Sequence, residues 1–256
     1  MNEADWLACL DPQKLLGFLR DRASERKLRL FAVACCRHIW HLLIDEQSQQ
    51  AVTVAERFAD GLVGEGARLA AWRAAQVVVD EHLSVVEWET ERWVVDAARA
   101  AAEAVCAGGE AAWEDNEGWQ AAAEYAALAA RCGGEQRIQV GLLRCLFGNP
   151  FQPGAVEHPL GLFWVPARNR LYSPAEMESL RPRVVAVRCH WLSWANRAIA
   201  QLAQGIYEGG RWGDLPVLAD ALEEAGCTEE TMLSHLRGPE PHARGCWVLD
   251  LLTGRG

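Results

Sequence analysis

Residues 28–42 read LRLFAVACCRHIWHL, and this stretch decides the fold. Its apolar side chains recur every three or four positions, at Leu28, Phe31, Cys35, Ile39 and Leu42. That spacing places them on one stripe of a helix, and Ser24 precedes the stripe as an N-cap. The stretch therefore predicts an amphipathic helix that runs to about Asp45 and packs against other helices.

The rest of the chain continues this helical pattern. Alanine-rich segments predict one long helix or two over 67–105 and another over 111–132, and apolar spacing predicts further helices over 135–148 and 184–206. Glycine pairs and N-capping residues separate the segments. We expect an all-α protein, a multi-helix bundle or helical-hairpin array, with residues 1–256 forming a single helical domain.

One segment, residues 149–174, departs from the helical pattern. It contains five prolines together with large apolar side chains, among them Trp164 and Leu171. A free linker would be more polar, so the composition predicts an ordered, irregular Pro/Trp-rich segment, an irregular loop or short hairpin lying on the helices.

Composition and charge narrow the class of protein. Half of the 256 residues are apolar and the formal net charge is -10, which excludes a disordered chain and disfavours nucleic acid as a partner. No apolar run reaches membrane-spanning length, so we expect no membrane contact. The nine cysteines are an odd number in a chain that opens without an export signal, which predicts free thiols and a cytoplasmic location.

Four blocks of sequence, taken in their order along the chain, resemble those of a known family. They are LRLFAVACCRHIWHL at 28–42, LFGNPF at 146–151, LPVLADALEEAGC at 215–227 and HLRGPEPHARGCWVLDLL at 235–252. Together they resemble a large paralogous family of planctomycete proteins of uncharacterised function. The resemblance implies an all-α protein and no particular activity. Residues 154–194 depart from the family pattern, as an insertion specific to this chain.

Cysteine and histidine form two candidate metal half-sites. Cys35, His38 and His41 are three residues apart in turn, so neighbouring pairs share a helix face. A second set, Cys227, His235, His242 and Cys246, lies on predicted helix ends and turns. If the two chain ends meet, the set Cys35, His38, His41, His242 and Cys246 would bind zinc. The alternative is that Cys35, Cys106 and Cys145 are apolar core residues and no cofactor is bound.

A thiol-dependent enzyme is a second alternative. Cys36 or Cys246 would be the nucleophile and a histidine the base, with Arg37 or Arg244 favouring the thiolate. The spacing matches no nucleophile motif, and the sequence contains no phosphate-binding loop or metalloprotease motif. The sequence therefore favours a protein that is not an enzyme.

Tryptophan and arginine mark a candidate interaction surface. Twelve tryptophans are present, and several lie near arginines in the insertion and beyond it, with further polar residues in the C-terminal turn: Trp164, Arg168, Arg170, Trp191, Trp194, His242 and Arg244. Tryptophan and arginine dominate the binding energy of protein interfaces. The leading hypothesis is a cytoplasmic protein-interaction module, a scaffold or adaptor with a protein partner.

Overall fold

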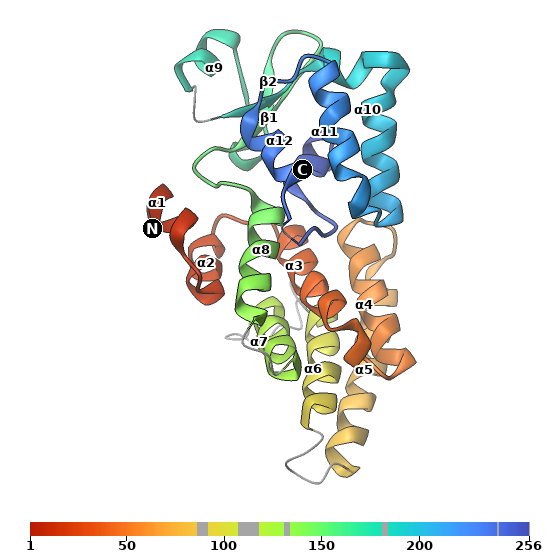
Figure 1. The fold of residues 1–256 in the computed structure, drawn as a ribbon. Helices are drawn as coiled ribbons and strands as arrows, with labels where there is room; N and C mark the ends of the chain where they lie inside the picture. Colours follow the sequence, from red (N-terminus) through yellow and green to blue (C-terminus); the bar gives the residue numbers. More distant parts are fainter. Residues whose placement is uncertain (86–91, 107–117, 131–133, 181–183, 240, 256) are drawn as a thin grey trace. The chain divides into compact units, whose positions relative to one another are not determined.

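The computed structural model describes residues 1–256 except 86–91, 107–117, 131–133, 181–183, 240 and 256. The described chain is mostly helical, and it also contains a four-stranded sheet, so the expectation of a purely all-α protein is wrong (Figure 1). The chain divides into two compact units: an N-terminal unit, Leu10–Leu143, and a C-terminal unit, Met1–Cys9 with Arg144–Gly256. Compactness alone does not establish independent folding, so the single-domain expectation stays a prediction.

The N-terminal unit is built from helices that bury alanine-rich faces. Its elements are α2 (Pro12–Leu19), α3 (Glu25–His38), the 3-10 turn η1 (Trp40–Leu42), α4 (Glu46–Ala59), α5 (Glu65–Val85), α6 (Arg92–Cys106), α7 (Gly118–Ala130) and most of α8 (Glu135–Phe147). Helix α6 contacts α3, α4, α5 and α7, and most of its alanines are fully buried. Alanine leaves little bulk between helix axes, so these helices pack closely.

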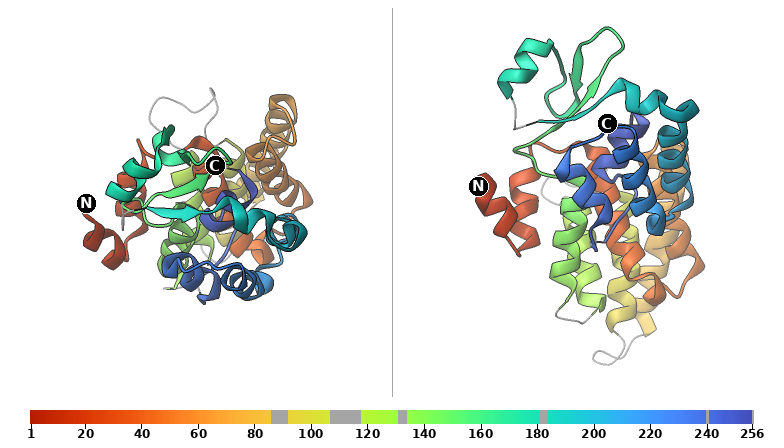
Figure 2. Two further views of the ribbon diagram at one scale, coloured as in Figure 1. Left: turned by 90° about the horizontal axis from the view of Figure 1, so that it is seen from above. Right: turned by 45° about the horizontal axis from the view of Figure 1, so that its top comes forward.

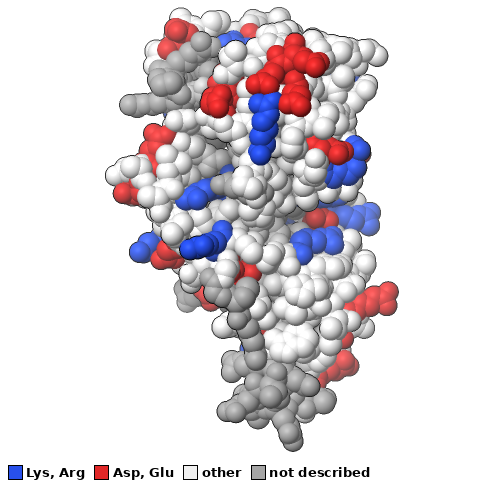
Figure 3. Space-filling view, viewed as in Figure 1, with Lys and Arg blue, Asp and Glu red and all other residues white. Residues whose placement is uncertain are grey.

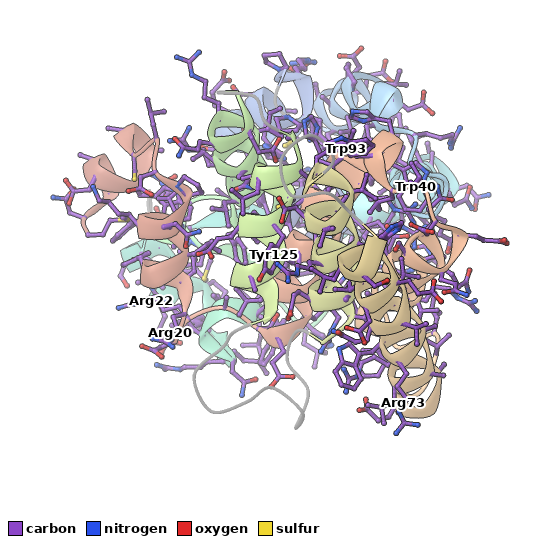
Figure 4. The ribbon with its side chains drawn as sticks, turned by 90° about the horizontal axis from the view of Figure 1, so that it is seen from below. Arg20, Arg22, Trp40, Arg73, Trp93 and Tyr125 are labelled. Carbon is purple, nitrogen blue, oxygen red and sulfur yellow. The ribbon has the colours of Figure 1, made fainter. Side chains whose placement is uncertain are left out.

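The predicted helix over 28–42 is present as α3. The Ser24 hydroxyl accepts a hydrogen bond from the backbone N–H of Lys27 at 3.4 Å and caps the helix. The helix ends at His38, earlier than expected, and η1 follows it. In η1, Trp40 lies 4.3 Å beneath the Arg37 guanidinium (Trp40 is labelled in Figure 4).

The segment 67–105 forms two helices, α5 and α6, and the residues that join them, 86–91, lie outside the described residues. Between α6 and α7, the Arg99 guanidinium lies 5.4 Å from the ring centre of Tyr125, which Figure 4 also labels. Arg73 extends from α5 away from the ribbon in the same view. The long side chains thus cover the helices while the alanines face inward.

The C-terminal unit combines helices with a small mixed sheet. Its elements are α1 (Glu3–Ala8), the end of α8, β1 (Gly154–Glu157), β2 (Phe163–Val165), the 3-10 turn η2 (Pro166–Arg168), β3 (Arg170–Tyr172), α9 (Pro174–Leu180), β4 (Val185–Val187), α10 (Cys189–Gly209), the 3-10 turn η3 (Trp212–Asp214), α11 (Leu215–Glu224), α12 (Glu230–Arg237) and α13 (Trp247–Thr253). The strand order is β3-β2-β1-β4, and β1 pairs with β4 in parallel. Figure 2 (right) shows the chain passing from the sheet into α10.

Strand β4 lies where the apolar pattern predicted the start of a helix. Val185 pairs with Gly154 and Val187 with Val156, and both valines are buried in the core. A run of β-branched residues this short fits a buried strand as well as a helix, and the sheet contacts decide the outcome. The predicted helix begins only at Cys189, and it is interrupted by non-helical residues from Trp194 to Arg197.

Each face of the sheet is covered by a different layer. On one face, Ala155, Phe163, Val165 and Tyr172 pack with Met177 of α9. On the other, Val185 and Val187 join the main core of the unit, which is formed with α10, α11, α12 and α13. Leu251 of α13 packs directly on Gly154, where a Cβ atom would overlap its side chain. Helix α13 thus joins the sheet to the helices.

Candidate metal centre

Four potential metal ligands meet in the C-terminal unit. One donor atom each from Cys145, His235, His242 and Cys246 lies within 4.8 Å of all the others. Cys145 is in the last turn of α8, His235 is in α12, and Cys246 is the residue that precedes α13. His242 lies in the turn between α12 and α13. Three separate segments of the chain therefore supply one cluster.

The turn between α12 and α13 sets the positions of His242 and Cys246. Pro239 and Pro241 restrict its backbone, and Gly245 adopts a φ of 83°, a left-handed conformation that favours glycine. The backbone N–H of Cys246 then donates to the carbonyl of Ala243 at 3.0 Å. This tight turn brings two residues four positions apart to the same cluster.

The end of α8 is held by two neighbouring contacts. Arg144 donates hydrogen bonds to the carbonyl oxygens of Leu7 at 2.7 Å and Cys9 at 3.1 Å, at the end of α1. Gly148 follows the helix with a φ of 61°, and the ring of Trp247 packs against it so closely that a Cβ atom would lie 3.0 Å from the ring. Cys145 is thereby fixed beside the residue that follows Cys246.

Two of the distances between donor atoms match those of tetrahedral zinc coordination. His235 Nε2 lies 3.3 Å from Cys246 Sγ, and His242 Nδ1 lies 3.6 Å from Cys145 Sγ. Around a tetrahedral zinc ion, with bonds of about 2.3 Å to sulfur and about 2.0 Å to nitrogen, neighbouring donor atoms lie about 3.5 Å apart. The two imidazole rings, with centres 5.0 Å apart, meet nearly at right angles. Two sulfur and two nitrogen atoms thus lie close enough to one another to bind a single ion.

Burial and hydrogen bonding act in opposite directions on the Cys246 thiol. Burial by itself raises its pKa, but hydrogen bonds with Cys145, His235 and His242 and the charge of His235 outweigh burial and hold the pKa well below its usual value. A lowered pKa favours the thiolate, which is the form that binds metals. Cys145 and Cys246 are both fully buried, while His235 and His242 are half-buried.

Three of the four residues in the predicted C-terminal set, His235, His242 and Cys246, lie in this cluster. Cys227 does not, because it is buried in the core of the C-terminal unit, and burial raises the pKa of its thiol. Cys145 takes part instead, although its helical pattern had indicated a core residue. It is 97 positions from His242, so no local spacing could have revealed it.

The other three predicted ligands lie in the N-terminal unit. Cys35 is fully buried, and burial raises the pKa of its thiol well above the usual value. His38 pairs with Glu135, with 3.4 Å between Nε2 and Oε2. His41 is exposed in η1. The structure thus gathers two of the five predicted ligands with two residues, Cys145 and His235, from outside that set.

The predicted nucleophiles are enclosed by protein. Cys36 is fully buried, and burial raises the pKa of its thiol to about 12. Cys246 favours the thiolate but has an exposed fraction of 0%. A buried thiolate between two imidazoles and a second sulfur is better placed to bind an ion than to attack a substrate.

The predicted interaction residues differ in exposure. Trp191 is buried in the core, and Trp194 packs against the same core. Arg244 is half-buried and donates to the carbonyl of Glu208 at 2.8 Å. Trp164 is 37% exposed on β2. Two arginines near β3 are also exposed, Arg168 and Arg170, and Arg170 pairs with Glu176.

Two further features concern the charge of the surface and the length of the apolar helices. On the face shown in Figure 3, basic side chains occur singly or in small groups with acidic ones among them. Within the described residues, no helix is both long enough and apolar enough to span a membrane.

Comparison with known proteins adds no identification: no family model, no curated protein and no solved structure matches the chain. The resemblance to the planctomycete family therefore stays an expectation from the sequence.

Proposed function

We propose that the chain binds one zinc ion through Cys145, His235, His242 and Cys246, and that this ion holds the C-terminal unit together. The observation that carries the proposal is the meeting of four donor atoms within 4.8 Å. Two thiolates and two imidazoles form a donor set that binds zinc in preference to magnesium or calcium, because those two ions prefer oxygen ligands.

The proposed ion has a structural role. Catalytic zinc sites keep one position open for water or substrate, whereas structural sites have four protein ligands. Here the protein supplies four donors, and both cysteines are buried. The ion would link the last turn of α8 to α12 and α13, so its binding energy would stabilise the folded state. Such thiols must stay reduced, which fits the proposed cytoplasmic location.

Elemental analysis of the purified protein, with variants of the cluster, tests the proposal. We expect about one zinc per chain in the wild type and in a Cys227→Ser control, whose thiol is also buried but lies outside the cluster. Cys145→Ser and Cys246→Ser should each lose most of the metal. A wild type without zinc, even after refolding with zinc present, would refute the proposal.

A second proposed role is protein binding through the sheet. Trp164 and Leu171 are directly opposite each other on β2 and β3 and are 37% and 48% exposed. They continue a cross-strand apolar row from Val187 and Val156, which pack against the core. Exposed apolar groups beside arginine are typical of protein-binding surfaces. The test compares how much partner protein is recovered with the purified wild type and with two variants. Trp164→Ser should recover less of it than the wild type, whereas Val217→Ser, an exposed apolar control on α11, should recover the same amount. Equal recovery by both variants would refute this role.

A further inference from the structure

The proposed metal centre contains two of the cysteines, and their sulfur atoms are neighbours. Cys145 Sγ and Cys246 Sγ lie within the same 4.8 Å cluster. A disulfide requires an approach to about 2.0 Å between the sulfurs. Cys246 lies outside the regular helix, at the position that precedes α13, with a φ of -48° and a ψ of 127°. Its side chain can therefore move toward Cys145 without disrupting a helix interior.

We propose that this centre is a redox switch, in which Cys145 and Cys246 form a disulfide on oxidation by a peroxide and the ion is released. The proposal rests on the zinc-binding function proposed above. In the oxidised state the two sulfurs would link α8 to α13 through a covalent bond. The two histidines would bind the ion only in the reduced state.

The other cysteines whose burial is described lie outside the cluster. Cys35 and Cys36 are adjacent in α3, where successive side chains point in different directions around the helix. Cys227 is buried in the core outside the cluster. Cys9, which follows α1, and Cys189, the first residue of α10, are half-buried and lie outside the cluster. The geometry thus selects one pair.

The chemistry balances with hydrogen peroxide as the oxidant. One cysteine sulfur attacks a peroxide oxygen, the O–O bond breaks, and the products are a sulfenic acid and, after protonation, one water. The second sulfur attacks the sulfenic sulfur, an S–S bond forms, and a second water leaves. In sum, two thiolates, one peroxide and two protons give one disulfide and two waters. Each sulfur loses one electron, and the peroxide gains both.

Access to the sulfurs passes the histidines. Both cysteines are fully buried, while His235 and His242 are half-buried and each contacts one of the sulfurs. A small oxidant therefore reaches the sulfurs only past His235 and His242. We expect oxidation to be slower than that of an exposed thiol, and large alkylating reagents to be excluded from the reduced centre.

The disulfide would preserve the link that the ion provides. It joins the same two segments, the end of α8 and the start of α13, while it frees both imidazoles. We expect the melting temperature of the oxidised protein to lie between that of the zinc-bound protein and that of the reduced, metal-free protein.

The test treats the full-length, zinc-loaded protein with hydrogen peroxide. A chromogenic chelator measures released zinc, and peptide mass spectrometry after alkylation identifies disulfides. We expect one zinc released per Cys145–Cys246 disulfide, and recovery of both thiols and zinc binding after reduction with zinc present. A Cys227→Ser control should behave like the wild type, whereas Cys145→Ser should give no linked peptide.

The outcomes separate the two proposals. Stoichiometric zinc that survives peroxide, with no Cys145–Cys246 disulfide after Cys9 and Cys189 are oxidised, would overturn the switch and leave zinc binding intact. A disulfide from either sulfur to another cysteine would also overturn it. A chain that takes up no zinc would overturn both the metal site and the switch that releases it, whether or not the two sulfurs pair.

Discussion

Replacing Cys145 by serine should destabilise the chain in a zinc-dependent manner. Cys145 and Cys227 are 0% and 4% exposed, so a serine at either position buries a hydroxyl at a cost of about 1–3 kcal/mol. Only Cys145 belongs to the cluster. At a free zinc concentration of 100 times the dissociation constant, losing the ion costs about 2.7 kcal/mol more. Cys145→Ser should therefore lower the free energy of unfolding by about 4–6 kcal/mol with zinc present.

The assay is urea unfolding of the wild type, Cys145→Ser and Cys227→Ser, each with zinc and with a chelator. In the chelator, the two variants should lose similar stability relative to the wild type, because each then pays only for its buried hydroxyl. When zinc is present instead of the chelator, Cys145→Ser should be less stable than Cys227→Ser. A difference of the same size in zinc and in the chelator would refute the reasoning.

Two further substitutions test the surroundings of the centre and the charge buried in the N-terminal unit. Gly148→Ala and Gly161→Ala each place a side chain at a positive φ, which costs about 1–2 kcal/mol. Only Gly148→Ala also presses on the ring of Trp247, so urea unfolding should show a larger loss of stability for Gly148→Ala than for Gly161→Ala. Equal losses would contradict the packing of Trp247 on Gly148. Burial raises the pKa of Glu135, although His38 and Gln139 oppose the rise. The contribution of this carboxyl to the stability of the folded protein is therefore present below its unfolded pKa and is lost as the pH rises through its folded pKa. Glu135→Gln should therefore raise the unfolding midpoint at pH 7 and have little effect near pH 4, and a lower midpoint at pH 7 would contradict this sign.

Local signals in the sequence predicted the helices well. The apolar stripe and the N-cap Ser24 correctly predicted α3. Helix α9 begins in a similar local way, because the backbone N–H of Ser173 donates to the Glu176 carboxylate and the backbone N–H of Glu176 donates to the Ser173 hydroxyl. These features depend on residues within one or two turns of each other, so the sequence contains the information directly, whereas the predicted helix over 184–206 begins as strand β4.

The sheet and the cluster depend on contacts between distant residues. The short run Val185–Val187 becomes a strand because Gly154–Val156 pairs with it, and nothing within the run itself distinguishes it from a buried helix. Cys145 likewise has the pattern of a core residue, and only the folded chain brings it to His242, 97 positions away. The sequence could therefore indicate His235, His242 and Cys246 as ligands but not Cys145, which completes the set.

X-ray absorption at the zinc edge of the purified protein tests the central claim most directly, because it identifies the donor atoms around the ion. The account predicts two sulfur atoms at about 2.3 Å and two nitrogen atoms at about 2.0 Å, with one sulfur lost in Cys145→Ser if that variant retains any metal. A first shell of nitrogen and oxygen alone, or one that Cys145→Ser leaves unchanged, would contradict it.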